Sequence, residues 1–146
     1  MYYIPTLQDV ELIGVADPGV PNKERIILRP WVDTNLQSYV VGLGKDIDGE
    51  GFVPIGNRIF FFTQTIPESG SWVIVYTGEG VSTQSELPTT GEKTYTFFWG
   101  FKNVIFLNPQ IIPILYSIGS MISGTPGKLS LPGYRPTANA IPRLGA

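Results

Sequence analysis

The sequence predicts an all-β fold, an antiparallel β-sandwich or small barrel of about seven or eight strands, with extended N- and C-terminal arms. Short runs rich in Val, Ile, Phe, Tyr and Trp recur along the chain, and clusters of Gly, Pro, Asn and Asp separate them. No segment shows a sustained helical period. Such runs are typical of a sandwich or small barrel, so we divide the chain into a short N-terminal arm (1–9), a β domain (10–119) and an extended C-terminal arm (120–146).

The β domain is expected to contain seven strands, with an eighth within residues 111–118. The predicted strands are 10–16, 24–32, 37–43, 58–64, 72–77, 93–101 and 103–107. Turn-forming residues lie between them. The longest polar stretch, 78–93, is predicted to be a protruding loop, the kind of segment that often carries recognition.

Alternation along two of these strands predicts what each face contacts. In 94–101, four aromatic residues share one face, which we assign to the core: Tyr95, Phe97, Trp99 and Phe101. In 72–77, both faces are largely apolar, as expected for a central strand whose second face is also covered. A single small sandwich covers one face of each sheet, so the arms or another subunit would cover the second.

The aromatic residues also allow a different interpretation. Trp31, Trp72 and Trp99, with neighbouring Tyr and Phe residues, could form a platform on which sugar rings stack. Aromatic residues in strands more commonly belong to a core, because they bury large areas and favour extended backbone. The core assignment is therefore the main prediction, and the platform is its alternative.

Composition excludes many kinds of catalysis. The 146 residues include no cysteine and no histidine, which removes thiolate nucleophiles, the usual zinc ligands and every Ser-His or Cys-His dyad. We predict no enzymatic activity, no cofactor and no metal. Charged residues make up 15% of the chain, below the roughly 25% of typical soluble domains, which indicates either polar, glycine-rich loops or a surface partly covered by partners.

Two arrangements of acidic residues could carry a function, and each has an ordinary loop as its alternative. The cluster at residues 44–51 alternates carboxylates with glycines and could bind Ca²⁺, but its spacing departs from that of an EF-hand, so a solvated loop between strands is preferred. A glycosidase needs only two carboxylates about 5–10 Å apart, and no signature supports one. The glycine pairs 42/44, 49/51 and 78/80 are predicted to lie in turns.

Residues 120–146 are rich in proline and glycine and contain no acidic residue. Repeated prolines prevent a helix and interrupt a strand ladder. The apolar side chains between them are too dense for a segment that stays solvated. We therefore predict an extended arm that binds a partner, although a disordered end is the alternative. Its predicted partner-binding residues are Leu129, Leu131, Tyr134, Arg135, Ile141, Arg143 and Leu144.

Charge is divided unevenly between body and arm. Residues 1–119 carry seven Lys/Arg and twelve Asp/Glu, a net charge of −5, whereas residues 120–146 carry three basic residues and a net charge of +3. This difference favours an arm that lies on the acidic body of a neighbouring copy or on another acidic partner. Nucleic acid is not expected as a partner, because three dispersed cations neutralise few phosphates.

No membrane partner is expected either. The longest apolar stretch, 104–118, contains two prolines and falls short of the roughly 20 residues that a spanning helix needs. The first residues lack the basic and uninterrupted apolar regions of a signal peptide, so synthesis in the cytoplasm is expected. Residues 1–5, aromatic and ending in proline, resemble a second and shorter arm.

A compact β domain with few charges, two-sided apolar strands and extended arms resembles, over the whole chain, the small β-rich accessory proteins of tailed-phage virions, such as capsid cement or decoration proteins. The resemblance implies a non-enzymatic virion protein that is made in the host cytoplasm. It implies a homo-oligomer, often a trimer, that binds coat protein subunits and stabilises the shell. The alternative is a carbohydrate- or receptor-binding β module of a fibre or surface protein, which predicts a solvent-facing Trp or Tyr beside polar loops.

Overall fold

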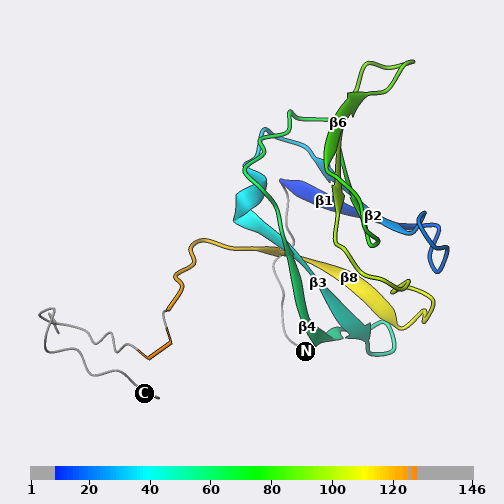
Figure 1. Ribbon diagram of the computed structural model, residues 1–146, viewed down its shortest axis with the longest axis vertical. Coiled ribbons are helices and arrows are strands. Elements are labelled where there is room, and N and C mark those ends of the chain that lie inside the picture. Colours follow the sequence, from blue (N-terminus) through cyan, green and yellow to red (C-terminus); the bar gives the residue numbers. More distant parts are fainter. Residues whose placement is uncertain (1–8, 125, 128–146) are drawn as a thin grey trace, which may run out of the picture.

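The computed structural model describes residues 9–124, 126 and 127, and this part of the chain is almost entirely β-structure (Figure 1). A single 3-10 turn, η1 (Leu36–Ser38), precedes the third strand in the described residues. The strands are β1 (Val10–Ala16), β2 (Arg25–Pro30), β3 (Tyr39–Asp46), β4 (Phe52–Phe61), β5 (Trp72–Tyr76), β6 (Thr83–Glu86), β7 (Lys93–Phe98) and β8 (Ile111–Ser117). The predicted all-β class is confirmed for these residues.

The strands form two separate sheets, a sandwich-like arrangement rather than a closed barrel. One sheet has five strands in the order β1-β2-β5-β7-β6, and the other has three in the order β4-β3-β8. Every pair of neighbours is antiparallel except β5 and β7, which are parallel. The prediction of a purely antiparallel sandwich is therefore wrong at this pair. After β5 the chain forms β6 at the edge of the five-stranded sheet. It then returns as β7, which lies between β5 and β6.

Two further predictions about strands are wrong. The stretch 78–93 contains β6, a fully exposed strand of polar residues that is held by pairing with β7, and the turn after it projects from the body (Figure 1). Residues 103–107 form no strand. The backbone N–H groups of Ile105 and Phe106 bind the carboxylate of Glu24 instead of a neighbouring strand.

An aromatic and aliphatic core fills the space between the sheets. Val73 and Val75 of the central strand β5 are fully buried, and the predicted aromatic face of β7 packs against them. Tyr95, Phe97 and Trp99 are buried in this core, so their assignment to the core is confirmed. The three-stranded sheet contributes the following core residues: Tyr39, Val41, Leu43, Phe60, Ile111 and Leu115.

An irregular stretch of β4 connects the two sheets at one edge. Pairing with β3 shifts between Val41 and Leu43, and Gly56 has a φ of 74°, a conformation that glycine adopts without strain. This bulge directs Arg58 toward the end of β7. Its guanidinium donates to the carbonyl of Trp99 at 3.2 Å and lies 4.0 Å from the ring centroid of Phe101.

Candidate functional site

A buried carboxylate joins three loops at one end of the sandwich. The side chain of Glu24, just before β2, is buried, with 2% of the residue exposed. Its Oε1 accepts from the N–H of Ile105 at 2.7 Å and from the hydroxyl of Thr77 at 2.8 Å. Its Oε2 accepts from the N–H of Gly19 at 2.7 Å and of Phe106 at 2.9 Å. One side chain therefore fixes the β1–β2 loop, the end of β5 and the segment after β7.

These four donors decide the ionisation of the buried group. Burial alone would raise the pKa of the Glu24 carboxyl, but the N–H groups of Ile105 and Gly19, the Thr77 hydroxyl and the N–H of Phe106 together hold its pKa below the ordinary value. The carboxyl is therefore ionised at neutral pH. With every oxygen engaged in two hydrogen bonds, its geometry is that of a structural anchor.

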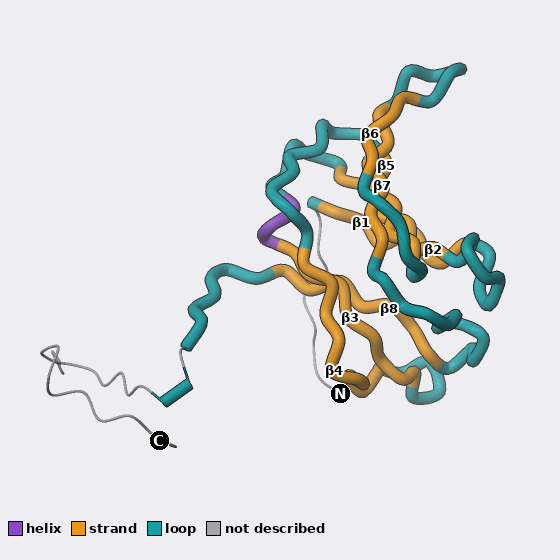
Figure 2. Tube along the Cα trace, in the orientation of Figure 1, coloured by secondary structure: helices purple, strands orange, loops and turns teal. Residues whose placement is uncertain are grey.

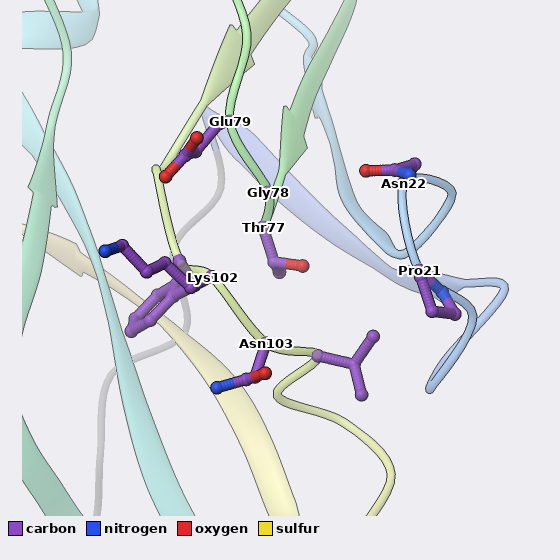
Figure 3. Close-up of a pocket in the computed structure, with 9 residues that line it drawn as sticks. Pro21, Asn22, Thr77, Gly78, Glu79, Lys102 and Asn103 are labelled. Carbon is purple, nitrogen blue, oxygen red and sulfur yellow. The ribbon is translucent and has the colours of Figure 1, made fainter.

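An open pocket of about 420 Å³ lies beside this anchor (Figure 3). The same three segments form its walls, with Asn22 on one side, Thr77 between, and Glu79, Lys102 and Asn103 on the other. Amide, carboxylate and ammonium groups at the rim could hydrogen-bond a polar ligand. Among the described residues, no group of three or more His, Cys, Asp or Glu side chains is arranged to hold a metal ion.

The acidic cluster at residues 44–51 connects β3 to β4, as the preferred interpretation predicted. Its turn is closed by bonds from the N–H of Ile47 to the carbonyl of Gly51 and from the N–H of Glu50 to the carbonyl of Ile47. The Asp46 carboxylate accepts from the N–H of Gly49 at 3.2 Å. This carboxylate thus stabilises the hairpin turn.

The outer face of the three-stranded sheet is apolar, as its core face is. Val40 and Gly42 alternate with the core residues of β3 and pair with Tyr116 and Ile114 of β8, so the four residues share the outer face. The chain itself buries Val40, Gly42 and Ile114 on this face. On the β4 side, Phe61 pairs with Val40 and belongs to the same face. A sheet of a simple sandwich needs only one apolar face.

A hollow of about 310 Å³ lies in this outer face. The ring of Tyr116 lies over Gly42, where an added Cβ would be 3.0 Å from its Cε2 atom. The prediction that Gly42 and Gly44 lie in a turn is wrong, since both are within β3. Because neither glycine has a side chain, the Tyr116 ring can lie directly over Gly42 and the Ile114 side chain over Gly44. The lining residues are Val40, Gly42, Leu43, Pro54, Ile55, Gly56, Arg58, Ile59, Tyr116, Ser117 and Ile118.

The outer face of the five-stranded sheet is covered differently. The guanidinium of Arg29 lies 4.1 Å from the ring centroid of Trp72 and 4.8 Å from that of Trp31, and it pairs with Glu92 at 2.8 Å. Arg25 lies over the ring of Tyr76, which stacks on Phe98. Arginine side chains of the same chain therefore cover much of the second apolar face predicted for residues 72–77.

The three tryptophans divide between the two alternatives that the sequence left open. Trp99 belongs to the core, with 7% of its surface exposed, and Trp72 is half-buried beneath Arg29. Trp31 is 46% exposed and fixed in place, because its Nε1 donates to Glu11 at 2.8 Å. They form no continuous platform, but Trp31 is an exposed aromatic residue beside a polar loop.

All seven predicted partner-binding residues lie in the arm outside the described residues: Leu129, Leu131, Tyr134, Arg135, Ile141, Arg143 and Leu144. The segment that leads to them is described. After β8 the chain leaves the sandwich as an extended loop that runs away from both sheets (Figure 2). Met121 and Ile122 in this segment are 66% and 98% exposed.

Sequence reasoning missed the hollow. The available signal was glycine at alternate positions of an apolar strand, at residues 42 and 44, together with the apolar run of β8. Comparisons with protein-family models, curated proteins and solved structures find no match to this chain. In the described part of the chain, no helix has the length and apolar character required to cross a membrane.

Proposed function

We propose that this chain is a non-enzymatic structural protein of a viral particle, of the capsid cement or decoration type. In this role it binds coat subunits and other copies of itself through the β domain and the extended arms. One observation carries the proposal: on the outer face of the three-stranded sheet, Ile59 and Phe61 are about half exposed beside an open hollow.

Exposed apolar surface of this kind favours association. Contiguous apolar patches on soluble proteins commonly mark interaction sites. Around this hollow, Ile59 and Phe61 are about half exposed, and the segment after β8 presents Met121 and Ile122 to solvent. Each such side chain contributes about 1.5–3 kcal/mol to an interface when it becomes fully buried. A few of them acting together would hold a subunit in an assembly after ordering costs are met.

Native mass spectrometry of the isolated chain tests the assembly part of the proposal. We expect a defined oligomer at micromolar concentration. We expect a chain that ends at Gly124 to give a lower oligomer mass or to lose binding to the particle. Circular dichroism of the shortened chain checks that the β domain is still folded. A full-length chain that remains monomeric and does not co-sediment with any coat shell would refute the proposed function.

The second candidate is a carbohydrate- or receptor-binding module, and the exposed, fixed ring of Trp31 favours it. Binding on a glycan array that Trp31→Ala abolishes would support this function. Val32→Ala is the matched control, because Val32 is the neighbouring residue and is exposed to the same extent. Equal binding by both variants, or none by the wild type, would exclude a role for Trp31.

A further inference from the structure

We infer that the hollow on the outer face of β4-β3-β8 receives the C-terminal arm, residues 128–146, of a second copy of this chain. The inference rests on the proposed function, in that it assumes the chain assembles with itself, and it names the surfaces that meet. The arm would place Leu129, Leu131 or Tyr134 in the hollow.

The shape and chemistry of the hollow suit an extended apolar segment. Pro54 and Ile59 of β4 form one side, Tyr116 and Ile118 form the other, and Gly42 lies between them. A volume of about 310 Å³ is at the lower end of the roughly 300–1,000 Å³ of small-ligand cavities. It therefore accommodates a few side chains of a crossing strand rather than a helix or a folded domain.

The composition of the arm matches this surface. Leu129 and Leu131 are two residues apart, so an extended backbone points both toward one side. Pro132 follows directly and restricts the unbound chain, which lowers the entropy lost on docking. The basic residues of the arm oppose the net charge of −5 carried by the body, and the acidic β3–β4 turn closes one end of the same sheet. The lining of the hollow itself includes Arg58 and no acidic residue, so the match inside it is between apolar groups.

The exit of the chain favours a second copy over the arm's own body. Ser117 and Ile118 line the hollow, and from there the chain runs outward with Met121 and Ile122 exposed (Figures 1 and 2). The 19 residues that follow Gly127 reach about 60 Å when extended. A domain of this size has a radius of gyration of about 13 Å, so the arm is long enough to reach a neighbour.

The stoichiometry fits a closed assembly. Each copy offers one arm and one hollow, so every arm is satisfied when copies exchange arms around a symmetry axis. A two-fold exchange or a small ring such as a trimer meets this condition. An open chain of copies would leave one arm and one hollow unused at its ends.

Disulfide trapping in the full-length chain tests the contact, because the natural sequence contains no cysteine. One copy carries Ile59→Cys at the hollow, and a separately labelled copy carries Leu129→Cys, Leu131→Cys or Tyr134→Cys. The copies are mixed, oxidised and weighed by mass spectrometry. The control replaces Val53 by cysteine, since Val53 is on the same strand and is exposed to a similar extent, 52% against 50%, but does not line the hollow.

We expect at least one arm position to give a cross-link between copies at fivefold or greater yield with Ile59→Cys than with Val53→Cys. We also expect Ile59→Asp to weaken association roughly tenfold or more relative to Val53→Asp. Equal yields at the two positions would overturn the inference. So would a double variant, Ile59→Cys with Leu131→Cys, that closes within one chain at high dilution.

Native mass spectrometry of the same samples separates the two levels of failure. An oligomer that forms without preferential cross-linking at Ile59 overturns the arm-in-hollow contact and leaves the proposed assembly function standing. A chain that stays monomeric at micromolar concentration overturns both. An oligomer that cross-links at Ile59 and weakens with Ile59→Asp supports both.

Discussion

Replacing the buried carboxylate by its neutral isostere should destabilise the whole domain. In Glu24→Gln the shape of the side chain is retained, but one oxygen becomes an NH₂ group that cannot accept a hydrogen bond. The wild-type carboxylate accepts two bonds at each oxygen: Oε1 from Ile105 and Thr77, and Oε2 from Gly19 and Phe106. If the NH₂ group replaces Oε2, the N–H groups of Gly19 and Phe106 both lose their acceptor. If it replaces Oε1, the N–H of Ile105 loses its acceptor, while the Thr77 hydroxyl can turn to accept from the NH₂ group.

The expected loss follows from the one or two donors left without an acceptor. A buried donor left without a partner costs about 1–3 kcal/mol, so Glu24→Gln should lower the free energy of unfolding by roughly 1–6 kcal/mol. A domain of this size has a total stability of about 5–15 kcal/mol, so the variant should be close to the limit of folding at 37 °C. The exposed residue Glu50 on the β3–β4 turn provides the matched control, and Glu50→Gln should change stability by less than about 0.5 kcal/mol.

Urea unfolding followed by tryptophan fluorescence measures both variants, and its pH dependence gives a second readout. The folded-state pKa of Glu24 lies below its unfolded-state value, so its contribution is complete above the ordinary glutamate pKa of about 4.3 and is lost as the pH falls through the folded-state value. Wild-type stability should therefore fall in acid more steeply than that of Glu24→Gln.

Two outcomes would refute this reasoning. One is a urea unfolding curve of Glu24→Gln at pH 7 with the same midpoint and slope as that of Glu50→Gln. This would mean that water replaces the lost hydrogen bonds with no loss of unfolding free energy. The other is an acid dependence that is identical in the wild type and Glu24→Gln. Either result would remove Glu24 as the group that fixes the three loops.

Two further predictions concern the outer face of the five-stranded sheet. Gly80→Ala should destabilise the domain by about 1–3 kcal/mol in urea unfolding, because the added Cβ would be 2.5 Å from the Phe98 ring. Gly78→Ala should be nearly neutral, because its added Cβ would be 4.0 Å from the Asn22 side chain, and equal effects of the two substitutions would contradict the packing. Arg29→Met should lower the unfolding free energy by roughly 1–2 kcal/mol, because the guanidinium loses its contacts with two indole rings. Arg25→Met should have a smaller effect, because the Arg25 guanidinium is 5.8 Å from the centroid of one ring. Thermal melts of the two variants measure the difference, and the reverse order would disprove this prediction.

Three strands were predictable from the local pattern of apolar residues in the sequence. The predicted range 10–16 coincides with β1, and the ranges 72–77 and 93–101 contain β5 and β7. In β5 and β7, residues at alternate positions face the core, as Val73 and Val75 do, whereas in β1 the alternation shifts at an irregularity between Leu12 and Gly14. The local pattern was sufficient because burial of one face determines both the strand and its orientation.

Features that depend on distant partners were not predictable in this way. The strand β6 is polar on both faces and exists through its pairing with β7. The apolar run 103–107 was predicted to be a strand, but the Glu24 carboxylate, some 80 residues earlier, takes the N–H groups of Ile105 and Phe106. A single buried carboxylate can redirect a backbone segment, and no local period reveals it.

The two sheets explain why a partner is proposed at one outer face rather than the other. The five-stranded sheet has aromatic side chains outside, but Arg25 and Arg29 of the same chain lie over them, and Gly80 packs against Phe98. Those contacts already remove much of the apolar surface from water. On the three-stranded sheet the chain itself buries Val40 and Ile114, but Ile59 and Phe61 of β4 are about half exposed beside an open hollow. Those exposed side chains are the apolar surface that a second copy can bury, so this edge of the sheet is where association would gain most.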